Sequence, residues 1–163
     1  MRHLLRDLIF IVCLLAGATG AAQASLASGE PLPAVTLPDA HGNTYRVPYS
    51  GVRYVLFGAD MDANALIERA FGELDSGEFT AAGLVYVADI SAMPALVARL
   101  FAMPALRDYP FRVLLAREAA AVAFFPRQAG AVTVVNVTPQ GEVVDVRFVR
   151  DETSLASLLP ASE

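Results

Sequence analysis

Short runs of consecutive apolar residues alternate with segments of helical spacing, and this alternation constrains the fold more than any other feature of the chain. Residues 54–57 and 84–88 are uninterrupted apolar runs, which are typical of strands buried on both faces of a sheet. Between them, residues 65–71 carry apolar side chains at helical spacing, in a stripe that extends to Leu74. A third strand is expected at residues 112–116. Strands that alternate with helices predict an α/β domain in which helices enclose a mixed sheet.

Two β-hairpins are expected, one near each end of this alternation. Residues 35–37 and 44–47 are β-prone and flank the turn-forming sequence PDAHGN, which predicts an N-terminal hairpin. Residues 132–137 and 142–148 flank the sequence TPQG, whose proline in the second place and glycine in the fourth suit a type I turn. His41 belongs to the first turn, so we expect an exposed loop residue there.

Three further helices complete the prediction. Ser91 and Pro94 suit the start of a helix that Pro104 would end or kink. A short helix is favoured at residues 118–125, and residues 151–159 are expected to form the last helix, with Asp151 as its cap. The side chains expected to face the core are Leu96, Val97, Leu100 and Phe101 in the first of these helices and Leu155, Leu158 and Leu159 in the last.

The first two dozen residues predict an export signal. A short basic head precedes the apolar run of residues 8–16, and small residues then lead to Ala22-Gln23-Ala24, which together form the three-part pattern of a signal peptide. We expect residues 1–24 to be a signal peptide cleaved after Ala24, residues 25–163 to be a single domain, and the location to be periplasmic or secreted. Because the apolar run is shorter than the roughly 20 residues of a bilayer span, no stable membrane span is expected after cleavage; a retained N-terminal anchor is the alternative.

Charge and cysteine content each argue against one class of function. The chain carries 12 basic and 17 acidic residues, a net charge of −5, so it lacks the positive charge on which binding to a phosphate backbone depends, and nucleic acid is not an expected partner. The single cysteine, Cys13, lies within the predicted signal peptide. The expected mature chain therefore has no thiol with which to form a disulfide.

Several of these segments, in their order along the chain, resemble the thioredoxin-like superfamily, in particular its redoxin branch and the YtfJ-type periplasmic proteins. They are the segment GEPLP at residues 29–33, the Asp-x-x-Gly turn at 39–42, the strand at 54–59, the segment DYPF at 108–111 and the hairpin at 134–143. The resemblance implies a thioredoxin-like mixed sheet with helices on both faces and an N-terminal hairpin.

The same resemblance identifies what this chain lacks. Active relatives carry Cys-x-x-Cys at the start of the helix after the first central strand, where helix amides and the helix dipole stabilise a thiolate. The corresponding positions here are Asp62 and Ala65, and no proline stands at residues 131–133, where the family has a cis-proline. Thiol–disulfide catalysis by side chains of the mature chain is therefore excluded.

The resemblance thus predicts an exported thioredoxin-fold protein that binds a protein, peptide or small ligand, with no catalytic residue and no cofactor. The expected groove lies beside the former active-site loop. The residues expected to border it are Asp60, Asp62, Asn64 and Ala65 on one side and Ala131 and Val132 on the other.

The polar residues 60–64 leave alternatives open. Asp60 and Asn64 are residue types that cap helices, and an acidic first turn suits the helix dipole. An Asp-x-Asp sequence after an apolar strand is also typical of phosphatases that use an aspartate nucleophile and a metal ion. Asp60 and Asp62, with Asp89, are therefore candidates for a cation site. The site would not be an EF-hand, because the EF-hand loop has glycine at its sixth position and this chain has Ala65 there. The alternative function is a metal-dependent hydrolase or a cation-binding protein.

Overall fold

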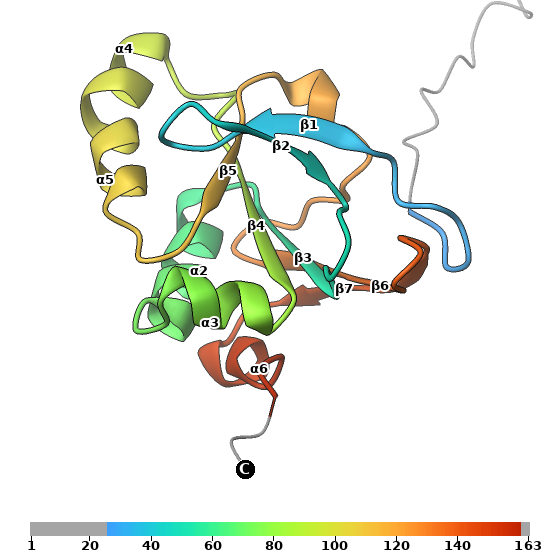
Figure 1. Cartoon of the computed structure of the whole chain (residues 1–163). Helices are drawn as coiled ribbons and strands as arrows, with labels where there is room; N and C mark the ends of the chain where they lie inside the picture. The colour runs from blue at the N-terminus through green and yellow to red at the C-terminus, as the bar shows by residue number, and fades with distance from the viewer. Residues whose placement is uncertain (1–25, 161–163) are drawn as a thin grey trace, which may run out of the picture.

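The computed structural model describes residues 26–160, so the predicted signal peptide, residues 1–24, lies outside the described part. A five-stranded sheet runs through the domain in the order β5-β4-β3-β6-β7 (Figure 1). β3, β4 and β5 are mutually parallel, whereas β6 and β7 form an antiparallel hairpin beside β3. The strands are β3 (Tyr54–Gly58), β4 (Leu84–Asp89), β5 (Val113–Ala116), β6 (Val132–Val137) and β7 (Val143–Val149). The predicted mixed α/β architecture is confirmed.

The central strands alternate their side chains between two separate cores. Leu56 of β3 lies in one core, and its neighbours Val55 and Phe57 lie in the other. All three are completely buried, because successive residues of a strand point to opposite faces of the sheet. A strand covered on both faces needs apolar residues at every position, which explains why residues 54–57 form an uninterrupted apolar run.

A separate two-stranded sheet covers part of one face. β1 (Val35–Pro38) pairs antiparallel with β2 (Thr44–Val47), which confirms the predicted N-terminal hairpin. Leu37 and Val47 place their side chains in the same core as Phe57. A single β-bridge between Asp39 and Leu114 joins the turn of this hairpin to β5 at the edge of the main sheet.

Helical segments lie against both faces of the main sheet, as predicted, but unequally. α2 (Met61–Phe71), α3 (Ser76–Ala81) and α6 (Glu152–Ala156) contribute to the core that contains Leu56. The opposite core receives the β1–β2 hairpin and the short 3₁₀ helix η2 (Ala119–Val122). The predicted helix at 118–125 is therefore only one 3₁₀ turn. The last helix is also shorter than predicted, although Asp151 caps it by accepting a hydrogen bond from the Ser154 amide at 2.8 Å.

The helical region between β3 and β4 differs from the prediction in the bounds of α2 and in the presence of a second helix. The helix begins at Met61 and ends at Phe71, so Leu74 lies beyond it. The following helix, α3, was not predicted. It begins at a capping box in which Asp75 and Glu78 each accept a hydrogen bond from the other's backbone amide, a sequence signal that could have revealed it. The buried residue of α3 is Phe79, and its ring stacks on the Phe111 ring at a centroid distance of 4.2 Å.

The predicted buried face of the next helix is wrong. This segment comprises α4 (Ala95–Val97), the π-helical turn η1 (Ala98–Ala102) and α5 (Met103–Arg107), and no side chain caps its start, so Ser91 is not an N-cap. Leu106 is the buried contact with the core, and Ala102 and Met103 pack against it. The residues expected to be buried are exposed instead, Leu96 by 68%, Val97 by 42%, Leu100 by 55% and Phe101 by 69%.

The spacing of the stripe does not show which side of the helix meets the core, and the segment also contains a π-turn before Pro104. The Met103 amide bonds to the carbonyl of Ala98, five residues earlier, which inserts one extra residue into the turn and rotates the following residues about the helix axis. Pro104 has no amide proton to give to the α-helical ladder, and the helix nevertheless continues to Arg107. The small side chain of Ala102 then faces the core, and the large apolar stripe faces outward.

Replacing Gly83 by alanine should destabilise the fold more than the same change at Gly42. Both glycines have a positive φ, +73° and +94°, so both variants carry the strain of the left-handed region. A Cβ atom at residue 83 would also lie 2.9 Å from the Gly51 carbonyl oxygen, whereas nothing lies within 4 Å at residue 42. In urea unfolding we expect Gly83→Ala to lose about 1 kcal/mol or more beyond Gly42→Ala; equal losses would show that the crowding is absent.

Candidate functional site

The Asp60 carboxylate joins the two loops that the sequence places at the candidate groove. It caps α2 by accepting a hydrogen bond from the Ala63 amide at 2.8 Å, and its other oxygen accepts one from the Gly130 amide, also at 2.8 Å. Asp60 follows β3, and Gly130 is two residues before β6. The structure therefore brings the β3–α2 loop next to residues 131 and 132, and one side chain fixes the distance between the two segments.

Asn64 faces the interior of the domain. Its amide oxygen accepts a hydrogen bond from the phenol of Tyr86, a fully buried residue of β4. Burial, with the nearby Tyr109 and Glu68, raises the pKa of Tyr86 well above its ordinary value, so this phenol remains a proton donor. Gly58 makes the pair possible, because a Cβ atom at that position would contact both Asn64 and the Tyr86 hydroxyl.

The other predicted groove residues differ in their exposure. Ala131 and Val132 are buried, Ala65 is half-buried, and Asp62 is exposed in the first turn of α2. The preceding residue, Met61, is 80% exposed and was not among the predicted site residues. The most exposed part of this segment therefore consists of Met61 and Asp62, next to the Asp60–Gly130 bridge.

The third candidate carboxylate, Asp89, forms an ion pair. The Arg127 guanidinium donates to it at 2.9 Å and the Ser91 amide donates to it at 2.9 Å, while the guanidinium also lies over the Phe57 ring. Burial alone would raise the pKa of Asp89, but the hydrogen bonds from Ser91 and Arg127 and the charge of Arg127 outweigh it, so the pKa lies below its ordinary value. Asp89 is thus held as a carboxylate by Ser91 and Arg127 together.

These contacts do not favour the metal-dependent alternative. Asp60 uses its two oxygens for backbone amides, and Asp89 is paired with an arginine. Among residues 26–160, no group of three or more His, Cys, Asp or Glu side chains is arranged to bind a metal ion.

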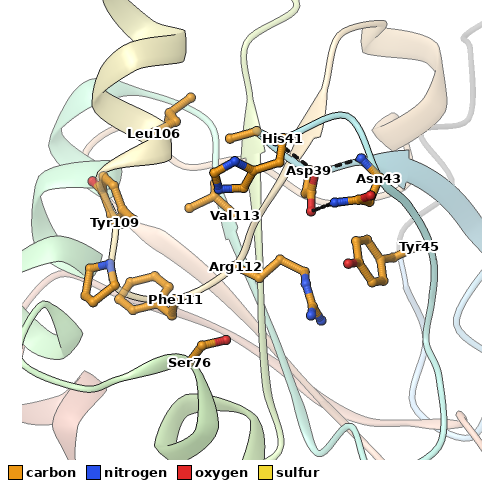
Figure 2. A pocket seen from close by; sticks show the side chains of 12 residues that line it. Asp39, His41, Asn43, Tyr45, Ser76, Leu106, Tyr109, Phe111, Arg112 and Val113 are labelled. Carbon is orange, nitrogen blue, oxygen red and sulfur yellow. Dashed lines mark hydrogen bonds between the residues drawn. The ribbon is translucent and has the colours of Figure 1, made fainter.

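A cavity that the sequence did not reveal lies between the turn of the first hairpin and the segment before β5 (Figure 2). It measures about 300 Å³, at the small end of the range for ligand pockets. The imidazole of His41, which is exposed as predicted, and the Arg112 guanidinium lie on it, and Arg112 stacks on the Tyr45 ring at 4.1 Å. Only the fold brings residues 39–45 next to residues 106–113, so no local pattern could identify this cavity.

Asp39 holds the hairpin turn that forms one wall of this cavity. Its carboxylate accepts hydrogen bonds from the amides of His41 and Asn43 at 2.8 and 2.9 Å and from the Asn43 side chain at 3.2 Å. Burial would raise the pKa of Asp39, but these hydrogen bonds lower it further than burial raises it. Opposite, burial and the Glu68 carboxylate raise the pKa of Tyr109 to about 12. Asp39 is therefore a structural carboxylate that shapes the turn.

Comparison with known proteins identifies the fold. No protein-family model matches the chain, and no curated protein matches it. Solved structures do. A Chlorobium tepidum protein described as a candidate thiol:disulfide interchange protein DsbE superposes with a TM-score of 0.58 at 17% identity, over 82% of this chain and 96% of its own. The fold is thioredoxin-like.

Two further thioredoxin-like structures agree with this assignment. The thioredoxin domain of a thiol-disulfide oxidoreductase from Bacteroides vulgatus has a TM-score of 0.54 at 18% identity, over 82% of this chain and 95% of that one. Peroxidoxin BcpB from Mycobacterium tuberculosis has a TM-score of 0.52 at 19% identity, over 82% and 96%. At these identities the likeness establishes the thioredoxin-like fold alone. No helix within residues 26–160 has the length and apolar character to cross a bilayer.

Replacing Asp60 by alanine should cost more stability than removing an ordinary helix cap. The variant loses the cap of α2 and also leaves the Gly130 amide without its acceptor, so we expect the free energy of unfolding to fall by about 2 to 3 kcal/mol. Asp151→Ala is the matched control, because Asp151 accepts only from the first turn of its own helix. Urea unfolding of both variants measures the difference; equal losses would mean that the Asp60–Gly130 bond contributes nothing.

The Asp89–Arg127 pair should stabilise the protein at neutral pH and lose its effect in acid. The pKa of Asp89 is lowered in the folded state, so the stabilisation is present above the ordinary pKa of 3.8 and disappears as the pH falls through the lower folded value. We expect Arg127→Gln to lose about 1 kcal/mol at pH 7, a modest value because Arg127 is partly exposed. The free energies of unfolding of the wild type and of Arg127→Gln should converge as the pH is lowered through the acid range. A difference between them that does not change with pH would contradict a stabilising Asp89–Arg127 pair.

Proposed function

We propose that this protein is an exported binding module of the redoxin branch, similar to the YtfJ-type periplasmic proteins, that uses a thioredoxin-like scaffold without thiol chemistry. One observation carries the proposal. At the start of α2, where the resemblance places the two active-site cysteines, the chain has Asp62 and Ala65. Neither side chain can form a mixed disulfide, and residues 26–160 contain no cysteine at all.

The β3–α2 loop supports binding through its rigidity. The Asp60 carboxylate holds this loop against Gly130, and the bond between Tyr86 and Asn64 fixes the first turns of α2 from inside. Both contacts exist before any partner arrives, so little conformational entropy would be lost on binding. The loop then presents Met61, which is 80% exposed, and the exposed carboxylate of Asp62.

These two side chains indicate the chemistry of the partner. A flexible thioether adapts to apolar surfaces of different shape, and an exposed carboxylate favours a cationic or amide group beside it. The proposed partner is therefore a protein or peptide segment that covers Met61 with an apolar side chain and faces Asp62 with a hydrogen-bond donor. Export is supported by the signal-like pattern of residues 1–24.

The absence of thiol catalysis can be measured with insulin. In the presence of dithiothreitol, the purified protein should leave the rate of insulin-disulfide reduction at the uncatalysed value. Because the chain outside the predicted signal has no cysteine, the rate should be the same for the protein and for its Cys13→Ser variant. Acceleration of insulin reduction by the variant would overturn the proposal.

The proposed contact edge can be tested in living cells. A photo-crosslinking amino acid at position 61 should give a discrete adduct on illumination of intact cells, and Asp62→Arg in the same chain should weaken that adduct because it reverses the local charge. The control places the crosslinker at residue 144, which is 44% exposed on β7. An adduct of equal yield at both positions, or at neither, would contradict a contact at this loop.

A further inference from the structure

The helical segment from α4 to α5 exposes an apolar stripe to solvent. The stripe consists of Leu96, Val97, Leu100 and Phe101, and each of these side chains is between 42% and 69% exposed. They stand at positions i, i+1, i+4 and i+5, so they share one side of a helix. Between residues 92 and 105, Arg99 is the only residue with a polar side chain. Figure 1 shows α4 and α5 at one margin of the molecule, and β7 forms the edge of the main sheet opposite β5. Exposed apolar surface of this kind marks a site that another phase or molecule covers.

A cavity of about 540 Å³ lies on the other side of the same helical segment, and three arginines line it. Its lining includes Arg99, Arg107 and Arg117 together with the apolar side chains of Ile90, Met93 and Met103. No Asp or Glu lines it, and none of the three arginines takes part in the ion pairs formed within residues 26–160, Arg69–Glu152 and Arg127–Asp89. The Nε of Arg107 donates to the Ala40 carbonyl at 2.9 Å, which holds this guanidinium in place.

We propose that the α4–α5 segment docks on an anionic membrane surface, with the apolar stripe entering the boundary of the acyl chains and the three arginines binding lipid phosphates. A guanidinium matches a phosphate group in shape and charge. A helix with apolar side chains on one side and arginine on the other, as Arg99 is here, is typical of helices that lie in the membrane interface.

The composition of the stripe favours a lipid surface over a protein partner. Protein interfaces carry roughly one hydrogen bond per 100–200 Å², and the stripe has no hydrogen-bonding side chain among its four members. A hydrocarbon boundary requires none. Most of the net charge of −5 is screened from this surface at physiological salt, because interactions between exposed charges fade beyond about 8 Å. The acidic residues next to the arginines in sequence are Asp108 and Glu118, and residues 90–107 include none.

A single tryptophan can report docking, because the chain has none of its own. Phe101→Trp places the reporter on the stripe, and Phe148→Trp, at a residue 40% exposed on β7, is the matched control. The probe is a vesicle of phosphatidylglycerol and phosphatidylcholine in equal parts. We expect the emission at residue 101 to shift to the blue and that at residue 148 to stay constant. Because each reporter senses only its own surroundings, attachment through another part of the chain would not move the reporter at residue 101.

The role of the arginines is tested in the Phe101→Trp background. Arg99→Gln together with Arg117→Gln should weaken vesicle binding about tenfold or more, whereas Arg147→Gln, an exposed arginine of β7, should leave it unchanged. Circular dichroism of each variant confirms that it is folded.

Three results would overturn the proposal. The first is an unchanged emission at residue 101 with the anionic vesicles. The second is equal binding to vesicles of phosphatidylcholine alone, because it would remove the role of the arginines. The third is a blue shift that grows with protein concentration in the absence of vesicles, because a second copy of the chain would then cover the stripe.

Discussion

Burial of β3 on both faces is the constraint on which the rest of this structure depends. Val55, Leu56 and Phe57 are completely inaccessible to solvent, and each such side chain stabilises the fold by about 1.5 to 3 kcal/mol relative to exposure. Both faces of this strand must therefore be covered. α2 and α6 contribute to the core on one face, and the first hairpin with η2 contributes to the core on the other.

The same constraint places the candidate site. A central strand can be polar only where it ends, and β3 ends at Gly58, two residues before Asp60. At this point the amides of the first turn of α2 need an acceptor. In a redox-active thioredoxin-like protein the helix terminus stabilises a thiolate; here the Asp60 carboxylate accepts from the Ala63 amide and, across the loop, from Gly130. Negative charge is favoured at a helix start in both cases, and in this chain the charge belongs to a carboxylate that joins two loops.

Elements whose environment is uniform were predictable. β3 and β4 are apolar as far as Gly58 and Ala88 because both of their faces are buried, and the two hairpins carry their turn residues within a few positions. α4 to α5 was predicted wrongly for the opposite reason. Its apolar stripe has the spacing of a buried helix face, and nothing in that spacing states which side of the helix meets the core. The packing of Ala102, Met103 and Leu106 in the core decided the orientation.

Sequence alone determined that the chain forms an α/β domain, that Asp60 stands at a helix start, and that residues 26–160 carry no thiol, because each of these is a property of neighbouring residues or of composition. Tertiary structure alone decided that Asp60 meets Gly130, that His41 lies on one cavity with Arg112, and that Arg99, Arg107 and Arg117 converge on another. These groups are separated by many residues along the chain. Only the order of strands in the sheet and the rotation of each helix bring them together, and no local pattern encodes either.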